Sequence, residues 1–307
     1  MKKNIIVSII VGLPGLFCNA QEVKVAFGKI QHIENFRPQL IDQRNIDIWL
    51  PDGYSNKEKY AVLYMNDGQA LYDAQSTWNK QAWGVDQTAG KLIAESKTQK
   101  FIVVGIWNNG IKRHSEYFPQ KPYKSLTRVQ QDTISRQLRT TGSVNEIFKP
   151  YSDLYLDFLV KELKPFIDKN FSSKSDQKNT FIAGSSMGGL ISLYAICEYP
   201  KVFGGAACLS THWPGTFTTK NNPIPDAIVR YLKANLPNQR NHKIYFDYGD
   251  QTLDATYKTF QEKVDVMMKA KGFTNKNWET KFFPGENHSE LAWAKRLDIP
   301  LLFLLKK

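Results

Sequence analysis

Short apolar runs alternate along the chain with longer segments in which apolar residues recur at helical spacing. The short runs predict β-strands, and the longer segments predict helices. The predicted strands are 44–50, 60–65, 101–107, 180–184, 204–209, 243–248 and 278–283. The predicted helices are 83–95, 151–171, 188–198, 224–234, 255–270 and 290–305. This alternation predicts an α/β fold with a mostly parallel central sheet and helices on both faces.

Two local features refine this prediction. The first two predicted strands are separated by a turn at 51–53, so we expect them to pair antiparallel at one edge of the sheet. Pro165 lies inside the helix predicted over 151–171. Because proline lacks the N–H group that a helix interior needs, Pro165 is expected to kink or shorten that helix.

One segment interrupts the alternation. Residues 108–150 are polar, rich in Arg, Gln, Ser and Thr, and only weakly periodic. A segment of this length is usually functional or mobile, so 108–150 is a candidate lid or substrate-binding insertion, with a surface excursion of no role as the alternative. No repeat or low-complexity linker divides the rest of the chain, and residues 21–307 are therefore predicted to form a single domain.

The start of the chain has the pattern of a secretory signal. Two lysines precede a mostly apolar stretch at 5–17, and small residues follow at the end of that stretch, up to Ala20. This pattern predicts a signal peptide over 1–20, with cleavage before Gln21 and export to the periplasm or the cell exterior. The apolar stretch is short for a membrane anchor, so no stable membrane insertion is expected.

Composition excludes several classes of protein. The chain has 307 residues, of which 42% are hydrophobic and 23% charged, which is typical of a globular protein rather than a disordered one. The formal net charge of +12 is spread along the sequence, without the clusters or motifs of a nucleic-acid partner. No zinc-finger spacing is present. Cys197 and Cys208 lie in apolar segments and are either paired or buried as free thiols, and the oligomeric state stays open.

The clearest candidate chemistry is a G-x-S-x-G motif at 184–188, with Ser186 at its centre. A predicted strand precedes the motif and a predicted helix follows it, which is the strand–turn–helix context of a serine nucleophile. The sharp turn requires glycine at both ends and lifts the hydroxyl of Ser186 above the sheet edge. The backbone N–H of Met187 then points to where an oxyanion would form.

A serine nucleophile needs a general base and an acid that orients it. In chain order the base comes last, and His288 directly follows the final predicted strand. The acid is expected in the loop after the strand 243–248, where Asp254 is favoured and Asp250 is the alternative. The second oxyanion donor is expected after the strand 60–65, which points to the backbone N–H of Gln69.

Aromatic residues near these loops are candidates for substrate contact. Trp78, Trp107 and Trp213 fall in or near loops at the expected active edge, and His212 follows a strand beside the nucleophile. Aromatic faces suit sugar rings or an aromatic acyl group. The competing interpretation is that several of these residues belong to the hydrophobic core, and that His212 only caps its strand.

Three motifs together resemble a known family. They read Val-Leu-Tyr-Met-Asn-Asp-Gly-Gln at 62–69, Gly-Ser-Ser-Met-Gly-Gly at 184–189 and Pro-Gly-Glu-Asn-His at 284–288. The chain resembles the esterase family of α/β-hydrolases, which includes feruloyl esterases, enterochelin esterases, S-formylglutathione hydrolase and mycolyltransferases. The resemblance implies the α/β-hydrolase fold, Ser186 as nucleophile, His288 as base and the Gln69 and Met187 amides as oxyanion donors. It also favours Asp254, although Asp250 stands where the family usually has threonine.

The function implied is an exported serine esterase that works through an acyl-enzyme and needs no metal or organic cofactor. The first expected substrates are feruloyl or acetyl esters on polysaccharides. The alternatives are a siderophore esterase, an acyltransferase to a sugar acceptor, and a non-catalytic binding module on the same scaffold.

Overall fold

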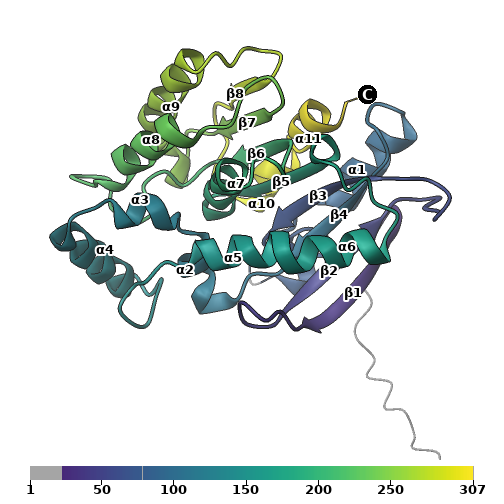
Figure 1. The fold of residues 1–307 in the computed structure, drawn as a ribbon, viewed down its shortest axis with the longest axis horizontal. Coiled ribbons are helices and arrows are strands. Elements are labelled where there is room, and N and C mark those ends of the chain that lie inside the picture. Colours follow the sequence, from purple (N-terminus) through teal and green to yellow (C-terminus); the bar gives the residue numbers. More distant parts are fainter. Residues whose placement is uncertain (1–22, 78, 307) are drawn as a thin grey trace, which may run out of the picture.

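A computed structural model describes residues 23–77 and 79–306. The predicted signal peptide at 1–20 lies outside the described residues. The described part contains an eight-stranded sheet in the order β1-β2-β4-β3-β5-β6-β7-β8 (Figure 1). Its strands are β1 (Lys29–Phe36), β2 (Arg44–Leu50), β3 (Ala61–Asn66), β4 (Phe101–Ile106), β5 (Thr180–Ser185), β6 (Gly205–Leu209), β7 (Lys243–Tyr248) and β8 (Trp278–Phe282).

Strand β2 pairs antiparallel with both β1 and β4, and every other pair of neighbouring strands is parallel. The predicted pairing of the first two predicted strands, 44–50 with 60–65, is therefore wrong. Strand β3 lies instead between β4 and β5, because a parallel sheet brings together strands that are separated by crossover helices. Strand β1 was not predicted, since polar residues interrupt its few apolar ones and most of its residues are exposed at the sheet edge.

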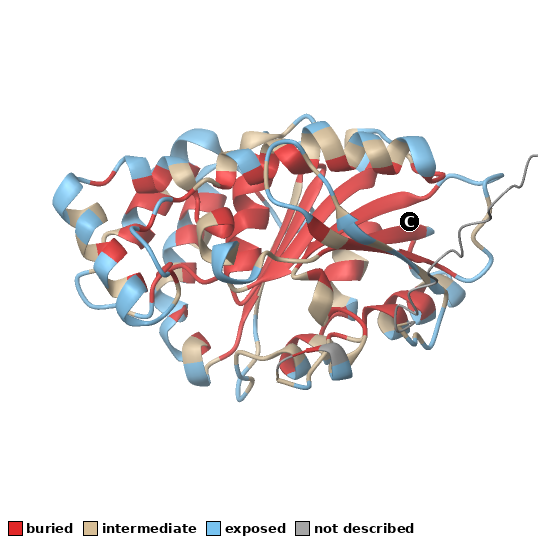
Figure 2. Cartoon of the chain, turned by 90° about the horizontal axis from the view of Figure 1, so that it is seen from below, coloured by how far each residue is buried: buried red, intermediate tan, exposed pale blue. Residues whose placement is uncertain are grey.

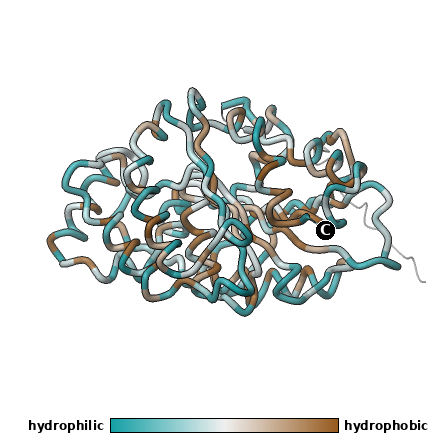
Figure 3. Tube along the Cα trace, turned by 90° about the horizontal axis from the view of Figure 1, so that it is seen from above, coloured by the Kyte–Doolittle hydropathy of each residue, from teal (hydrophilic) through white to brown (hydrophobic). Residues whose placement is uncertain are grey.

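Helices cover both faces of the sheet, as predicted. One core contains residues of α1 (Val85–Ala94), α10 (Glu290–Ala294) and α11 (Asp298–Leu305). The larger core on the opposite face contains residues of the remaining helices. These are α2 (Arg113–Tyr117), α3 (Gln120–Lys124), α4 (Arg128–Thr140), α5 (Ser152–Phe158), α6 (Lys164–Asn170), α7 (Met187–Glu198), α8 (Ile224–Asn235) and α9 (Lys258–Ala270). Figure 2 shows the buried strands between helices whose outer sides are exposed, and Figure 3 shows the matching hydrophilic periphery.

The helix predicted over 151–171 contains a π-helical turn, Leu159–Leu163, between α5 and α6. Pro165 is the second residue of α6, two positions after the end of that turn. A wider turn relieves the clash between a proline ring and the preceding carbonyl groups, so the helix continues through Pro165 by widening rather than by ending.

Residues 108–150 are mostly helical and contain α2, α3 and α4. The start of α4 carries a capping box, in which Thr127 accepts from the Gln130 N–H and Gln130 accepts from the Thr127 N–H. Figure 1 shows α4 beyond the end of the sheet, while α3 lies against α8. The two ends of the segment, at 110–114 and 142–143, reach the cavities around Ser186.

Cys197 and Cys208 are both buried and free. Burial raises the pKa of both thiols, which makes them unreactive packing residues. Among the helices in residues 23–77 and 79–306, none has the length and apolarity required to cross a bilayer. The same described residues hold no group of three or more His, Cys, Asp or Glu arranged to bind a metal ion.

Candidate active site

Ser186 occupies a strained turn between β5 and α7. Its backbone angles are φ 57° and ψ −123°, a conformation that side chains rarely adopt. A Cβ atom on Gly184 would lie 2.6 Å from the carbonyl carbon of Gly188, so the turn requires glycine there. Hydrogen bonds fix both peptide groups of the serine, because the Ser186 N–H donates to Leu209 O at 2.9 Å and the His212 N–H donates to Ser186 O at 3.1 Å.

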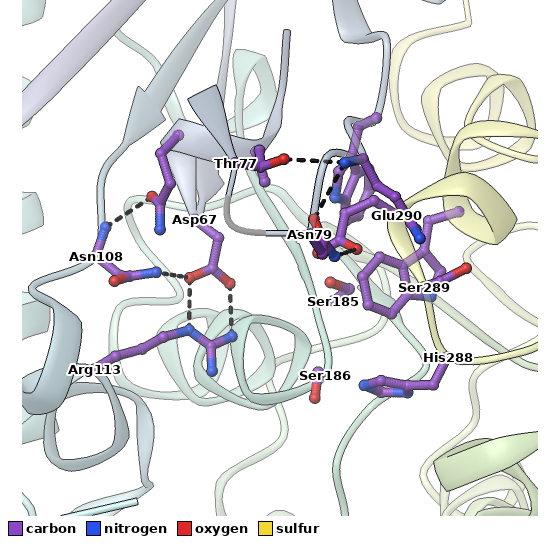
Figure 4. A pocket seen from close by; sticks show the side chains of 15 residues that line it. Asp67, Thr77, Asn79, Asn108, Arg113, Ser185, Ser186, His288, Ser289 and Glu290 are labelled. Carbon is purple, nitrogen blue, oxygen red and sulfur yellow. Dashed lines mark hydrogen bonds and ion pairs between the residues drawn. The ribbon is translucent and has the colours of Figure 1, made fainter. Parts of the chain in front are cut away.

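His288 and Asp254 form a close pair beside Ser186. His288 Nδ1 lies 2.6 Å from Asp254 Oδ1, and the His288 N–H donates to Thr252 Oγ1 at 3.0 Å. Asp254 is 1% exposed, and its Oδ2 accepts from the Gly249 N–H at 2.7 Å. Figure 4 shows the imidazole directed toward Ser186. Because Nδ1 is engaged by the carboxylate, Nε2 is the nitrogen available to the serine.

The other two aspartates of this region have different contacts. Asp250 accepts from the Gly285 N–H at 2.8 Å and so braces the loop that carries His288. Asp247 is fully buried inside β7 and pairs with Arg296 at 2.9 Å. Of the three carboxylates, the structure brings only Asp254 to the imidazole of His288.

The loop after β3 is tightly built. Asp67 has a left-handed backbone, with φ 60°, and a Cβ atom on Gly68 would lie 2.5 Å from the backbone of Gly105 in β4. Gln69 follows and lines the cleft at Ser186. Across the cleft, Met187 is the first residue of α7, where helical N–H groups point outward and the helix dipole favours negative charge.

An ion pair ties this loop to the 108–150 segment. Arg113 Nε and Nη2 each donate to the carboxylate of Asp67 at 2.7 Å, and Asn108 Nδ2 donates to Asp67 Oδ1 at 2.8 Å. Burial alone would lower the pKa of Arg113, but the charge and the hydrogen bonds of Asp67, with smaller contributions from nearby groups, together raise it. Arg113 was not predicted as a site residue, since it lies in a segment that is only weakly periodic.

Two hollows meet at Ser186. The larger has a volume of about 750 Å³ and also contains His288 and Gln69 (Figure 4). Most of the residues that line it are polar, including Thr77, Asn79, Gln81, Asn108, Arg113 and Glu290. The smaller hollow, of about 380 Å³, is more apolar and is lined by Ile111, Met187, Phe217 and Leu253 together with two histidines. Ser186 is thus open to two chemically different spaces.

The two histidines of the smaller hollow are His114 and His212. Burial lowers the pKa of His212 to about 3 and that of His114 to about 4, so both imidazoles are neutral near pH 7. His212 Nδ1 lies 2.6 Å from the phenol oxygen of Tyr257. His212 therefore lies in the wall of this hollow, and its backbone N–H contacts Ser186 directly.

Two of the three tryptophans predicted to contact substrate, Trp107 and Trp213, do not line these hollows in the structure. Trp213 is 1% exposed, packs on Phe246 and donates to Gln261, so it belongs to the core. Trp107 Nε1 donates to Asp47 Oδ2 at 2.5 Å. Asp47 lies on β2, the strand that pairs with β4. Trp78 lies outside the described residues.

Sequence comparison gives a family match and a curated relative. The family model described as "Putative esterase" matches residues 38–302. An endo-1,4-beta-xylanase/feruloyl esterase of Xylanibacter ruminicola is 27% identical over 281 residues, which are 88% of this chain. The chain spans only 30% of the length of that relative.

Solved structures share the fold. A ferulic acid esterase superposes with a TM-score of 0.63 at 19% identity, covering 90% of this chain and 98% of its own. An enterobactin esterase of Shigella flexneri superposes with a TM-score of 0.62 at 15% identity, covering 92% of this chain and 60% of its own.

Proposed function

The chain belongs to the esterase family of α/β-hydrolases, and from this premise we propose that Ser186, His288 and Asp254 are its catalytic triad. Membership of the family makes the protein a carboxylic ester hydrolase. The observation that carries the assignment of residues is the 2.6 Å contact between His288 and Asp254, with the imidazole directed toward a serine in a strained turn.

The proposed reaction passes through an acyl-enzyme. His288 Nε2 takes the proton of Ser186 as the hydroxyl oxygen attacks the ester carbonyl. The backbone amides of Gln69 and Met187 donate to the oxyanion of the tetrahedral intermediate. His288 then protonates the leaving alcohol, and afterwards takes a proton from the water that releases the acid. Asp254 holds the imidazole in the tautomer with the proton on Nδ1 and stabilises its charged form.

This mechanism assigns the two hollows to the two parts of the ester. The leaving alcohol must receive its proton from His288, which lines the larger, polar hollow. The acyl group then extends into the smaller hollow, beside Met187 and the neutral His212. Many polar side chains on the alcohol side suit an alcohol that carries several hydroxyl groups, as a sugar does.

We therefore propose that the natural substrates are acyl esters of carbohydrates, with feruloyl or acetyl groups on polysaccharides as the first candidates. The name of the Xylanibacter ruminicola relative, endo-1,4-beta-xylanase/feruloyl esterase, supports this class. We also propose that residues 21–307 form one domain in which 108–150 completes both cavities. Export is proposed from the pattern at 1–20, and N-terminal sequencing of the protein recovered outside the cytoplasm should begin at Gln21.

A hydrolysis panel tests the substrate class. Purified protein is assayed with methyl ferulate, acetylated xylan, a feruloylated arabinoxylan oligosaccharide and enterobactin, and released acids are quantified by chromatography. We expect the highest kcat/KM with a carbohydrate ester. A higher kcat/KM for enterobactin would overturn the substrate class and favour a siderophore esterase. Acyl transfer to an added sugar would indicate a transferase, and no turnover of any ester together with no fluorophosphonate labelling would indicate a binding module.

A further inference from the structure

A buried ion pair lies next to the proposed triad and takes no part in the reaction described above. Asp247 and Arg296 are 0% and 3% exposed, and Arg296 Nη2 and Nε donate to the Asp247 carboxylate at 2.9 and 3.2 Å. Burial raises the pKa of Asp247 despite this partner. The free-energy cost of burying two charges can equal the gain from their attraction, so the pair need not stabilise the fold. Its contacts indicate another role.

Ser210 connects the ion pair to the triad acid. Its Oγ lies 2.6 Å from Asp254 Oδ2, 3.0 Å from Trp293 Nε1 and 3.1 Å from Arg296 Nη2. Trp293 and Arg296 are donors only at these atoms, so both of these contacts occupy lone pairs of the hydroxyl oxygen. The single hydroxyl proton of Ser210 is therefore directed to Asp254.

The backbone of Ser210 is held in an unusual conformation by the same residues. Its φ is 41°, in the left-handed region, and its N–H donates to the backbone oxygen of Asp247 at 2.9 Å and to Asp247 Oδ1 at 3.1 Å. A serine with a left-handed backbone is kept there by its surroundings. Asp247, which directly contacts Arg296, thus fixes the backbone of Ser210 while Arg296 and Trp293 fix its hydroxyl.

We propose that Ser210, oriented by Arg296 and Trp293, is a positioning residue that holds the carboxylate of Asp254 in place for His288. This inference rests on the proposed triad. The Ser210 hydroxyl and the Gly249 N–H both bond to Oδ2 of Asp254, which leaves Oδ1 for the imidazole. The carboxylate cannot rotate away from His288 without losing both of these bonds. The ion pair is present in the core because it sets the direction of one hydroxyl group.

The proposal predicts a change in the pH dependence of kcat/KM, because the Ser210 hydroxyl donates a hydrogen bond that stabilises the negative charge of Asp254. Without the hydroxyl, more of that charge faces His288 and favours the imidazolium, so the protonated base persists to higher pH. Other titratable or charged groups surround the Asp254–His288 pair on the neighbouring elements. They are Tyr257, His212, Asp250, Glu286, Glu290, Arg113, Asp247 and Arg296. Among them, Tyr257 and His212 are neutral near pH 7, since burial raises the pKa of the phenol and lowers that of the imidazole.

The test is Ser210→Ala, assayed for kcat and for kcat/KM against pH with a small aryl ester. We expect kcat to fall about 10- to 100-fold, the range that a hydrogen bond to a charged group supports. KM should change little, and the acidic limb of kcat/KM should move to higher pH by about half a unit. Ser210→Gly removes the same hydroxyl while relieving the left-handed backbone, so it serves if the alanine variant does not fold.

The matched control is Ser172→Ala. Ser172 is another buried serine whose hydroxyl donates to a backbone oxygen, that of Glu58, in the loop before β3. Its loss should lower the melting temperature but leave kcat and the pH profile unchanged. A Ser210→Ala enzyme with the wild-type pH profile, or an equal shift in the Ser172→Ala enzyme, would overturn the proposal. Failure of the triad itself is separately visible, because Ser186→Ala would then remain active.

Discussion

Replacing Ser186 with alanine is expected to lower kcat on the order of a million-fold, the loss seen when a comparable serine triad loses its nucleophile. The reason is that the acyl-enzyme can no longer form, while the two cavities and the oxyanion amides remain. A residual rate above that of water is expected, because substrate binding and the oxyanion donors still act. The measurement is hydrolysis of 4-nitrophenyl acetate by enzyme and variant, with labelling by a fluorophosphonate probe as a second readout.

The fold should survive this substitution. Alanine keeps the Cβ atom and leaves unchanged the two backbone hydrogen bonds that fix residue 186, so the strained turn is under the same constraints. Thermal unfolding should therefore shift by only a few degrees, whereas Ser172→Ala should keep full esterase activity. Near-normal turnover by Ser186→Ala in a folded state would refute the triad, whatever the substrate.

The interior of the sheet was predictable because its strands are short, mostly apolar segments. Strand β7 (Lys243–Tyr248) has the predicted bounds, since it is buried on both sides and flanked by polar loops. The edge strand β1 escaped prediction because it pairs on one side only and carries mostly polar residues. Strand neighbours were harder still. The chain places β3 between β4 and β5, and adjacency in sequence does not encode that order.

In the candidate site, the order of the elements along the chain was predictable, but the directions of the side chains were not. The place of Ser186 in its turn and of His288 after the last strand follows from the order of elements, which the sequence contains. The choice between Asp250 and Asp254 does not, because both lie in one loop and only the folded backbone decides which carboxylate faces the imidazole. Trp213 illustrates the converse, since it follows the strand next to Ser186 but its ring is buried in the core.

Replacing Asp254 with asparagine is expected to lower kcat about 10⁴-fold, as in a serine triad whose acid becomes an amide. Asparagine fits the same space, but its NH₂ group donates to His288 Nδ1. The imidazole is then held in the tautomer with its proton on Nε2, which cannot accept the proton of Ser186. The measurement is kcat for a small aryl ester, with circular dichroism to establish that the variant is folded.

Asp250→Asn provides the matched comparison, because Asp250 lies four residues earlier in the same loop. Its carboxylate accepts from the Gly285 N–H and from Gln251, and an amide oxygen can still accept those bonds. We expect less than about a tenfold loss of kcat, the effect of one weakened hydrogen bond away from the imidazole. The reverse result, with Asp250→Asn inactive and Asp254→Asn active, would assign the acid to Asp250. It would also remove the basis for Ser210 as a positioning residue, since that hydroxyl contacts Asp254 alone of the two.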